Sequence, residues 1–259
     1  MSEQAVLWKK EDGVCVITMN TPASLNAMSN EIVTGLEEAI EDCFDERIRA
    51  VVLTGAGRAF CAGGDLAQAI KHGAPDWLRQ TPKRLAVVTS CIRRLPKPVI
   101  ASINGPAFGV GMSIAMACDL RIMSEKASLA QAYTSVGLSP DGAWTLTVPQ
   151  IVGLAMAMEM VLLDKPIHAE DALRLGLVSM VFPADELPEQ TMKLAKKLAN
   201  GPTQAYASAK ALINASMLHA LEAQMEAERF RISACGATQD FTEGSDAMFN
   251  RRKPAFQGK

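Results

Sequence analysis

Apolar and polar residues along the first half of the chain recur with the periods of strands and helices. Residues 5–10 and 14–20 alternate around Asp12-Gly13, which predicts a hairpin with a two-residue turn. The other elements expected here are a helix over 30–44 capped by Ser29, buried strands at 51–54, 98–103 and 120–123, and helices opening near Gly64 and covering 77–95 and 109–117.

The second half of the chain has a mainly helical pattern. Helices are expected over 142–163, with a bend near Pro149 and Gly153, and over 169–175, 184–199, 203–215 and 218–233, with one short strand at 177–182. Alternating strands and helices followed by a run of helices predict an α/β fold with a helical C-terminal region.

Two segments of the first half weakly repeat each other. The strand at 51–54 leads through a glycine-containing turn to 63–64 and a helix. The strand at 99–103 leads to 109–111 and another helix at nearly the same spacing. This near-repetition predicts a spiral of strand–strand–helix turns, in which two helix N-termini lie one above the other.

These glycine-rich helix starts are the first candidate for chemistry. Helix N-termini present unpaired N–H groups and partial positive charge, so two of them aimed at one point can form an oxyanion hole. The same glycines can equally serve only the close packing of strand against helix, and the pattern leaves both interpretations open. A dinucleotide-binding fingerprint is excluded, because Ile114 stands where its third glycine or alanine belongs.

The composition excludes several classes of protein and site. The chain has 259 residues, of which 49% are apolar and 21% charged, and this is typical of a folded globular protein. Its 26 basic and 28 acidic residues give a net charge of −2, so no nucleic-acid partner is expected. The three histidines, His72, His168 and His219, are too few for a histidine-rich metal site, and no metal is predicted.

Cysteines and uncharged segments bear on the compartment. Six cysteines are scattered without a C-x-x-C pair, which indicates reduced thiols in a cytoplasmic protein. Residues 1–4 lack the pattern of a signal peptide. The uncharged run 98–118 is long enough to cross a bilayer, but Asn104, Pro106 and three glycines divide it into strand, turn and helix, so no membrane association is predicted.

Six separated segments carry a more specific signal. They are Leu25-Asn26-Ala27-Met28, Val51-Val52-Leu53-Thr54-Gly55, Ala59 to Leu66, Lys97 to Ala101, Asn104 to Gly109, and Ala172 to Val178. In order and spacing these segments resemble the enoyl-CoA hydratase/isomerase (crotonase) family, and the resemblance covers essentially the whole chain.

The resemblance implies a fold, an assembly and a substrate. It implies a spiral of ββα turns over 1–199, followed over 200–259 by a helical region through which the chain forms a homotrimer or a hexamer, a dimer of trimers. It implies an acyl-CoA substrate, with coenzyme A carried as part of the thioester and no separate cofactor. The backbone amides of Gly64 and Val110 would form an oxyanion hole that stabilises an enolate.

The resemblance also indicates where the substrate would lie. Residues expected to contact it are Ser24, Leu25, Ala62, Gly63, Asp65, Leu66 and Gly109 along the coenzyme, Phe256 over the nucleotide, and Tyr133 and Trp144 in the acyl pocket. The family's frequent Lys or Arg before the L-N-A sequence is Ser24 here, which removes one expected phosphate contact.

Asp141 is the side chain expected to carry the chemistry. Hydratases of the family hold water between two glutamates, but Ser113 and Tyr133 stand at those positions. From the residues alone, Asp141 in the sequence Pro-Asp-Gly can be the N-cap of the following helix. The resemblance, closest in pattern to enoyl-CoA isomerases of the phenylacetate-pathway type, implies instead that Asp141 is an acid/base.

An isomerase of fatty acid or aromatic acid metabolism is therefore favoured. Asp141 would move a proton between the two ends of a dienolate and so shift a double bond. The alternatives that stay open are an enoyl-CoA hydratase with an atypical base, a dehalogenase or hydrolase that uses Asp141 as a nucleophile, and an inactive scaffold with the same fold.

Overall fold

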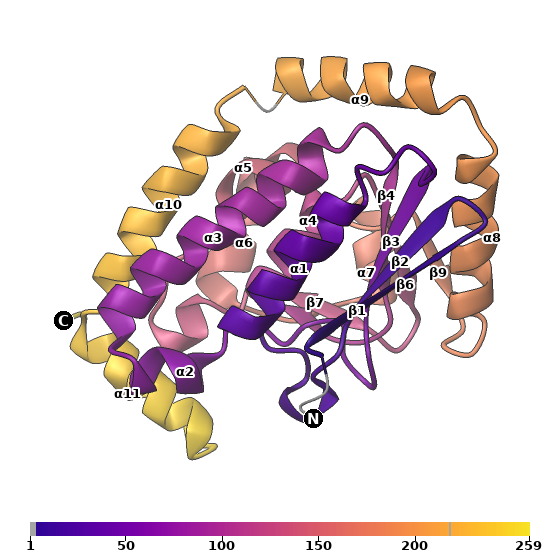
Figure 1. Cartoon of the computed structure of the whole chain (residues 1–259). Helices are drawn as coiled ribbons and strands as arrows, with labels where there is room; N and C mark the ends of the chain where they lie inside the picture. The colour runs from indigo at the N-terminus through magenta and orange to yellow at the C-terminus, as the bar shows by residue number, and fades with distance from the viewer. Residues whose placement is uncertain (1–3, 218) are drawn as a thin grey trace.

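Two sheets organise the computed structural model, which describes residues 4–217 and 219–259 (Figure 1). The larger sheet has the strand order β1-β2-β3-β4-β6-β9, and the smaller has the order β5-β7-β8. The strands are β1 (Val6–Glu11), β2 (Val14–Met19), β3 (Ala50–Gly55), β4 (Val99–Ile103), β5 (Ala107–Phe108), β6 (Leu120–Ser124), β7 (Ser128–Ala130), β8 (Ile167–His168) and β9 (Met180–Phe182). Only the β1–β2 and β7–β8 pairs are antiparallel among those described.

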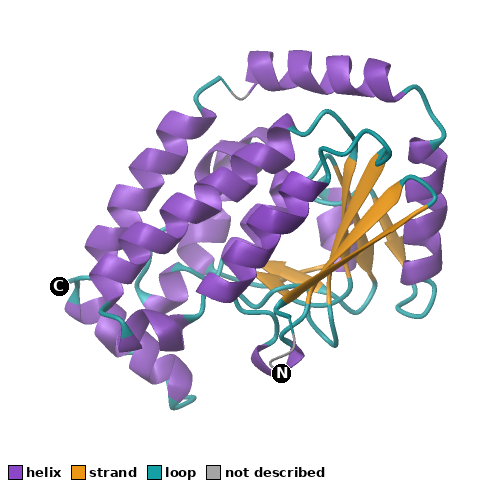
Figure 2. Ribbon diagram, viewed as in Figure 1, coloured by secondary structure: helices purple, strands orange, loops and turns teal. Residues whose placement is uncertain are grey.

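Helices cover both faces of the larger sheet (Figure 2). The helices are α1 (Asn30–Asp42), α2 (Leu66–Lys71), α3 (Ala74–Arg94), α4 (Val110–Ala117), α5 (Trp144–Val152), α6 (Leu154–Leu163), α7 (Ala169–Arg174), α8 (Leu187–Ala199), α9 (Thr203–Met217), α10 (Leu221–Cys235) and α11 (Gln239–Phe249), with 3-10 turns η1 (Pro22–Ser24) and η2 (Thr134–Val136). The α/β class with a helical C-terminal end, expected from the sequence, is confirmed.

The central strands are apolar on both faces because both faces are covered. Val52 of β3 packs with Ile100 and with Leu187 of α8. Its neighbours Val51 and Leu53 belong to the main core on the other face, with residues of α1, α3 and α4. Successive strand residues point to opposite faces, so a strand covered twice is a continuous apolar run.

The local signals of the N-terminal half are present in the structure. Asp12 and Gly13 both have positive φ, 51° and 76°, as a two-residue hairpin turn of type I′ requires. Ser29 caps α1, and its Oγ accepts a hydrogen bond of 3.3 Å from the N–H of Ile32.

Two of the elements predicted for the second half differ clearly from the structure. The helix predicted over 142–163 is two helices, because Gly153 has a φ of 79° and separates α5 from α6. The strand predicted over 177–182 begins only at Met180. Residues 1–3, on which the signal-peptide expectation partly rests, and residue 218, where a helix was expected to begin, lie outside the described residues.

The short strands of the smaller sheet and α11 are not apparent from the sequence pattern. The sequence of α11 is polar along most of its length and contains Gly244, which weakens its helical signal. Packing explains this glycine, because a Cβ there would lie 2.7 Å from the backbone carbon of Val136 in η2. Tertiary contact therefore selects a residue that local helix propensity disfavours.

The C-terminal helices run back to the α3 side of the molecule. In Figure 1, α9 spans from α8 to α10, and α10 lies beside α3, with which it makes extensive contact. Across residues 4–217 and 219–259, none of the helices combines the length and the hydropathy that a bilayer crossing requires.

Asn26 fastens the loop before α1 to the segment after β3. Its side chain is fully buried; Oδ1 accepts from the N–H of Thr21 at 2.9 Å, and Nδ2 donates to the carbonyls of Ala56 and Ala59, each at 2.9 Å. Its φ of 57° is one that asparagine tolerates better than most residues. These bonds explain the asparagine of the L-N-A sequence.

Asn26→Ala is therefore expected to lower the free energy of unfolding by about 2–4 kcal/mol, because it leaves buried backbone groups unpaired. Urea denaturation measures this loss. The control is Asn200→Ala, at an exposed residue with no side-chain hydrogen bond to the described chain. A loss for Asn26→Ala no greater than for the control would contradict the assignment.

Candidate active site

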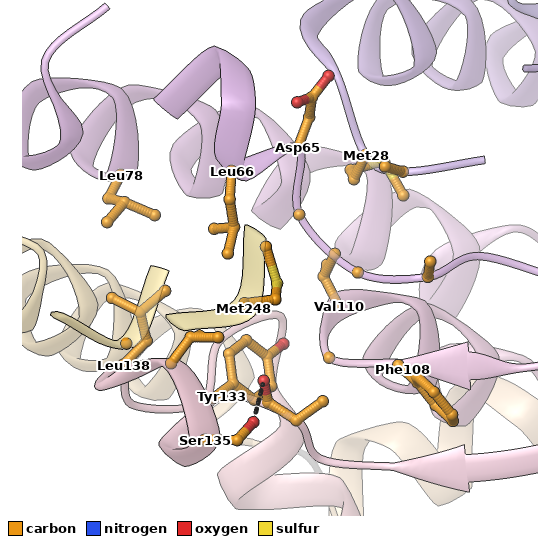
Figure 3. A pocket seen from close by; sticks show the side chains of 18 of the residues that line it. Met28, Asp65, Leu66, Leu78, Phe108, Val110, Tyr133, Ser135, Leu138 and Met248 are labelled. Carbon is orange, nitrogen blue, oxygen red and sulfur yellow. Dashed lines mark hydrogen bonds between the residues drawn. The ribbon is translucent and has the colours of Figure 1, made fainter. Parts of the chain in front are cut away.

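A cavity of about 600 Å³ lies between the loops that follow the central strands, α3 and the C-terminal helices. Its wall is largely apolar, and Leu66, Leu78, Leu138 and Met248 converge on it from different elements (Figure 3). Apolar hollows with a few polar groups are typical binding sites for small molecules.

Two backbone N–H groups reach this cavity without a partner. Gly64 precedes the N-cap of α2, and Val110 is the first residue of α4. Both residues line the cavity, and neither N–H donates a hydrogen bond to any group in residues 4–217 or 219–259. Unpaired donors at or beside helix starts carry partial positive charge, so they can receive a developing oxyanion.

Close contact between two chain segments brings these donors together. Cys61 forms a parallel bridge with Ala107, and the N–H of Phe108 donates to the Cys61 carbonyl at 2.9 Å. A Cβ at Gly109 would lie 3.5 Å from the Cα of Gly63, so the two glycine turns are in van der Waals contact. The structure thus agrees with the stacked turns that the repeat in the sequence predicts.

Glycine at position 111 makes this contact possible. A Cβ there would lie 2.3 Å from the carbonyl oxygen of Cys61, which is far inside van der Waals distance. Any larger residue at Gly111 would therefore push α4 away from the 61–64 segment and separate the two N–H groups.

Asp141 brings a buried carboxyl group to the same cavity. The residue is only 5% exposed, and its Oδ1 accepts a hydrogen bond of 2.7 Å from the hydroxyl of Tyr133. The Tyr133 hydroxyl also lies 3.0 Å from the Oγ of Ser113, which donates to the Asp141 carbonyl at 2.9 Å. Tyr133 therefore holds the carboxyl group of Asp141, and Ser113 holds both the Tyr133 hydroxyl and the backbone of Asp141.

Burial changes the acidity of this group. Loss of hydration raises the pKa of Asp141 to about 6, although the Tyr133 hydrogen bond acts in the opposite direction. Burial likewise raises the pKa of Tyr133, and the neighbouring charge of Asp141 adds to that rise. Tyr133 therefore stays a protonated donor while Asp141 can change its protonation near neutral pH.

The other charged groups of the cavity wall have structural partners. Within the described chain, Asp65 and Asp141 are the acidic residues that line the cavity, and Arg252 is the basic one. The Asp65 carboxylate caps α2 by accepting from the N–H of Gln68 at 3.0 Å, and in Figure 3 it points away from the cavity. Asp141 is thus the carboxyl group available to a molecule bound inside.

Most residues that the sequence nominates lie together at this cavity. Those that line it are Ser24, Ala62, Gly63, Gly64, Asp65, Leu66, Gly109, Val110, Tyr133 and Asp141. Leu25, Trp144 and Phe256 are not among the lining residues.

Trp144 does not line the acyl pocket as expected. It is the first residue of α5, and its side chain, 1% exposed, packs into the main core instead. Leu25 ends η1, where its carbonyl accepts from the N–H of Ala62 at 3.0 Å. Phe256 is 40% exposed in the C-terminal segment, although the nearby Pro254 does line the cavity.

The C-terminal helices supply a part of the wall that the sequence pattern does not indicate. Ile232 of α10 and Met248 of α11 line the cavity, as do Gly244 and Phe249. One signal for α11 was available, because Thr238 is a good N-cap and its side chain accepts from the N–H of Phe241.

The chain is similar to known proteins in both sequence and fold. A family model described as enoyl-CoA hydratase/isomerase matches residues 9–259. The chain is 36% identical to a probable enoyl-CoA hydratase of Rhodobacter capsulatus, with 100% of both covered, and 34% identical to the 1,2-epoxyphenylacetyl-CoA isomerase of Escherichia coli, with 98% of both covered. A solved enoyl-CoA hydratase structure from Mycobacterium avium subsp. paratuberculosis matches with a TM-score of 0.90 at 36% identity, over 98% of both chains.

The buried Asp141 has a predictable effect on stability. Its pKa is raised from 3.8 to about 6 in the folded protein, so the folded protein binds this proton more tightly than the unfolded chain does. The resulting stabilisation is complete below the unfolded pKa and is lost as the pH rises through the folded pKa.

As the pH rises from 4 to 8, the free energy of unfolding of Asp141→Asn, which cannot ionise, is therefore expected to increase relative to that of the unsubstituted protein. At about 1.36 kcal/mol per pKa unit the gain is at most about 3 kcal/mol. Urea denaturation at both pH values measures it, with Asp185→Asn, at an exposed residue, as control. An equal gain in both variants, or no gain at Asp141, would show that burial of this carboxyl group is not responsible.

Proposed function

The chain belongs to the enoyl-CoA hydratase/isomerase family and has its α/β crotonase fold with C-terminal helices, and from this premise we propose that it shifts a carbon–carbon double bond within an enoyl-CoA thioester. The observation that carries the proposal is a single available carboxyl group, Asp141, in one cavity with two unpartnered backbone N–H groups. One acid/base suffices to move a proton between two carbons of the same substrate.

The proposed reaction uses the two N–H groups and the carboxylate in turn. The thioester oxygen accepts hydrogen bonds from Gly64 and Val110. The Asp141 carboxylate takes a proton from the α or γ carbon: that C–H bond breaks, and its electron pair enters the conjugated system with charge on the thioester oxygen. Asp141 then returns the proton to the other end of the dienolate, which relocates the double bond and restores the carboxylate.

The surroundings of Asp141 support this role. A pKa of about 6 lets the group serve as base and as acid near neutral pH. Tyr133 binds Oδ1, whereas Oδ2 accepts no hydrogen bond from the described part of the chain and is left for the substrate proton. The geometry therefore orients the carboxyl group without occupying both of its oxygens.

The cavity wall suggests how the thioester lies. Coenzyme A would follow the segments that carry Ser24 and residues 62–66, and its phosphates would approach Arg252, which is paired with Glu243 and Asp246. The acyl group would lie among Leu78, Leu85 and other apolar side chains, so it is expected to be uncharged. We include Gly63, Leu66 and Gly109 among the proposed substrate contacts, and not Trp144.

A hydratase is the second candidate, because one of the relatives is a probable enoyl-CoA hydratase at 36% identity. In that reaction Asp141 would activate a water molecule, with the Tyr133 hydroxyl at the position where the family resemblance expects a glutamate. Hydration by one carboxyl group requires it to act on two reactants, the water and the α carbon, which makes the double-bond shift the simpler use of this cavity.

We also propose that the chain assembles as a trimer or as a hexamer. Large apolar side chains of α6 and α9 are exposed, with Leu154 at 73%, Leu162 at 72% and Leu212 at 72%. Exposed apolar surface of this kind is typical of protein–protein contacts. Leu212 supports the interpretation that residues 200–259 take part in oligomerisation, and Leu154 and Leu162 add α6 to the proposed contact surface.

Asp141→Asn is expected to lower kcat for isomerisation of a 3-enoyl-CoA by about 100- to 10,000-fold, because the amide keeps the Tyr133 hydrogen bond but cannot carry a proton. In the unsubstituted protein, kcat/KM is expected to rise as the pH passes through about 6 and the carboxyl group ionises. The ultraviolet absorbance of the conjugated thioester measures both, with Asp185→Asn as control. Full activity in Asp141→Asn would refute the assignment.

Turnover in ¹⁸O-labelled water distinguishes the possible reactions. The proposed isomerisation incorporates no oxygen, whereas hydration labels the 3-hydroxyl of the product. Nucleophilic attack by Asp141, as in a dehalogenase or hydrolase, labels the aspartate itself after a single turnover. A chain that binds no acyl-CoA at all would instead be a scaffold.

The proposed assembly predicts a trimeric or hexameric mass in light scattering after size-exclusion chromatography. Leu212→Glu is expected to reduce that mass, because it puts a charge into a contact between subunits. Arg47→Glu, at an exposed residue of the loop before β3, is the control. A monomeric mass for the unsubstituted protein would contradict the proposal.

A further inference from the structure

A second buried carboxyl group, Glu228 of α10, lies just outside the cavity wall. It is 4% exposed and accepts hydrogen bonds from the N–H of Ala143 at 2.7 Å, the N–H of Thr145 at 2.9 Å and the hydroxyl of Thr145. These donors belong to the start of α5, where N–H groups have no partner inside the helix. A residue far along the chain therefore caps α5.

The chain that Glu228 holds is strained. Gly142 has a φ of 67°, and Ala143, a residue with a Cβ, has a φ of 69°. A left-handed conformation at alanine costs roughly 1–2 kcal/mol, and it persists only where surrounding contacts enforce it. Ala143 is fully buried, and its N–H bond to Glu228 is one such contact.

This strained turn carries Asp141. The N–H of Trp144 donates to the Asp141 carbonyl at 3.3 Å, and the Oγ of Ser113 donates to the same carbonyl. A Cβ at Gly142 would lie 2.9 Å from the Cβ of Ser113, so the turn is packed closely against α4. A displacement of Ala143 would consequently move the backbone of Asp141.

We propose that Glu228 is a positioning residue for Asp141: its carboxylate, supplied by α10, holds the 141–143 turn in the conformation that aims the Asp141 carboxyl group into the cavity. Glu228 is not among the residues that line the cavity, so it acts through the turn and not on the substrate. The kinetic part of this inference rests on the proposed acid/base role of Asp141; the geometric part does not.

The protonation of Glu228 bears on this role. Burial raises the pKa of Glu228 to about 7, and the charge of Asp141 contributes to the rise. A protonated carboxyl group loses acceptor capacity, so it holds the two N–H groups less well. Below this pH the turn is expected to loosen while Asp141 also takes up its proton.

The groups that act on Glu228 electrostatically are few. Asp141 faces it from the turn, and Glu228 in turn raises the pKa of Tyr133. From the neighbouring helix α3, the charge of Lys83 acts on Glu226, and the carbonyl of Arg79 accepts from Arg229. Lys83 thus acts on Glu226, on another face of α10 from Glu228, and Arg84 and Arg93 of α3 pair with Glu37 and Asp119.

Glu228→Gln tests the proposal, because glutamine keeps the size of the side chain and one acceptor oxygen but loses the charge and presents N–H donors to the turn. We expect kcat for 3-enoyl-CoA isomerisation to fall about 10- to 100-fold with little change in KM, as small displacements of a catalytic group do. We also expect the acid limb of the plot of kcat against pH to change. In the unsubstituted protein it reflects the loss of two protons, from Asp141 and Glu228, and in Glu228→Gln the loss of one, from Asp141. Glu226→Gln, on the same helix and 52% exposed, is the matched control and should behave like the unsubstituted protein.

A second measurement keeps the inference separate from the proposed function. The pKa of Asp141, followed without substrate by the carboxyl bands in infrared difference spectra against Asp141→Asn, is expected to rise in Glu228→Gln, because displacement of the turn weakens the Tyr133 hydrogen bond that lowers this pKa. If no enoyl-CoA is turned over by the unsubstituted protein, the proposed function fails while this titration still tests the positioning. A lower melting temperature with unchanged kcat, pH profile and Asp141 titration would overturn the inference.

Discussion

The contact between the segment after β3 and the segment after β4 is the constraint on which the rest of the site depends. Both strands are parallel neighbours, so their loops leave the same edge of the sheet and the Cys61–Ala107 bridge can form. Gly111 lets α4 start directly beside the Cys61 carbonyl. The two N–H groups are therefore held by backbone geometry alone, and no titratable side chain is needed to make them donors.

Because the donors do not titrate, the pH dependence of the site is left to carboxyl groups. Asp141 is buried among apolar neighbours, and the dehydration that makes its charged form costly also makes it a usable base near neutral pH. Stability and reactivity are therefore opposed at this residue. The Tyr133 hydrogen bond limits the cost by stabilising the charged form.

The sequence predicts the parts of this site that depend on local conformation. The turns at 63–64 and 109–111, and Asp141 before a helix, are short-range patterns, and the structure brings them to one cavity. Side-chain direction is a tertiary property, which is why the sequence nominates Trp144 for the cavity while its side chain packs into the main core. Glu228 could not be distinguished from the exposed glutamates of α10, since only packing against the turn makes it a buried cap.

The C-terminal helices supply a part of the cavity wall that is separate from the two N–H groups and Asp141. The donors and Asp141 come from the strand-and-helix core, whereas Met248 and Phe249 of α11 close part of the cavity. Gly244 allows α11 to pack closely against η2, and it is itself one of the residues that line the cavity. Changes along α11 can therefore alter the acyl group that fits without moving the reacting atoms. Changes on α10 near Glu228 are expected to move the Asp141 carboxyl group as well, because Glu228 of that helix binds the turn that carries it.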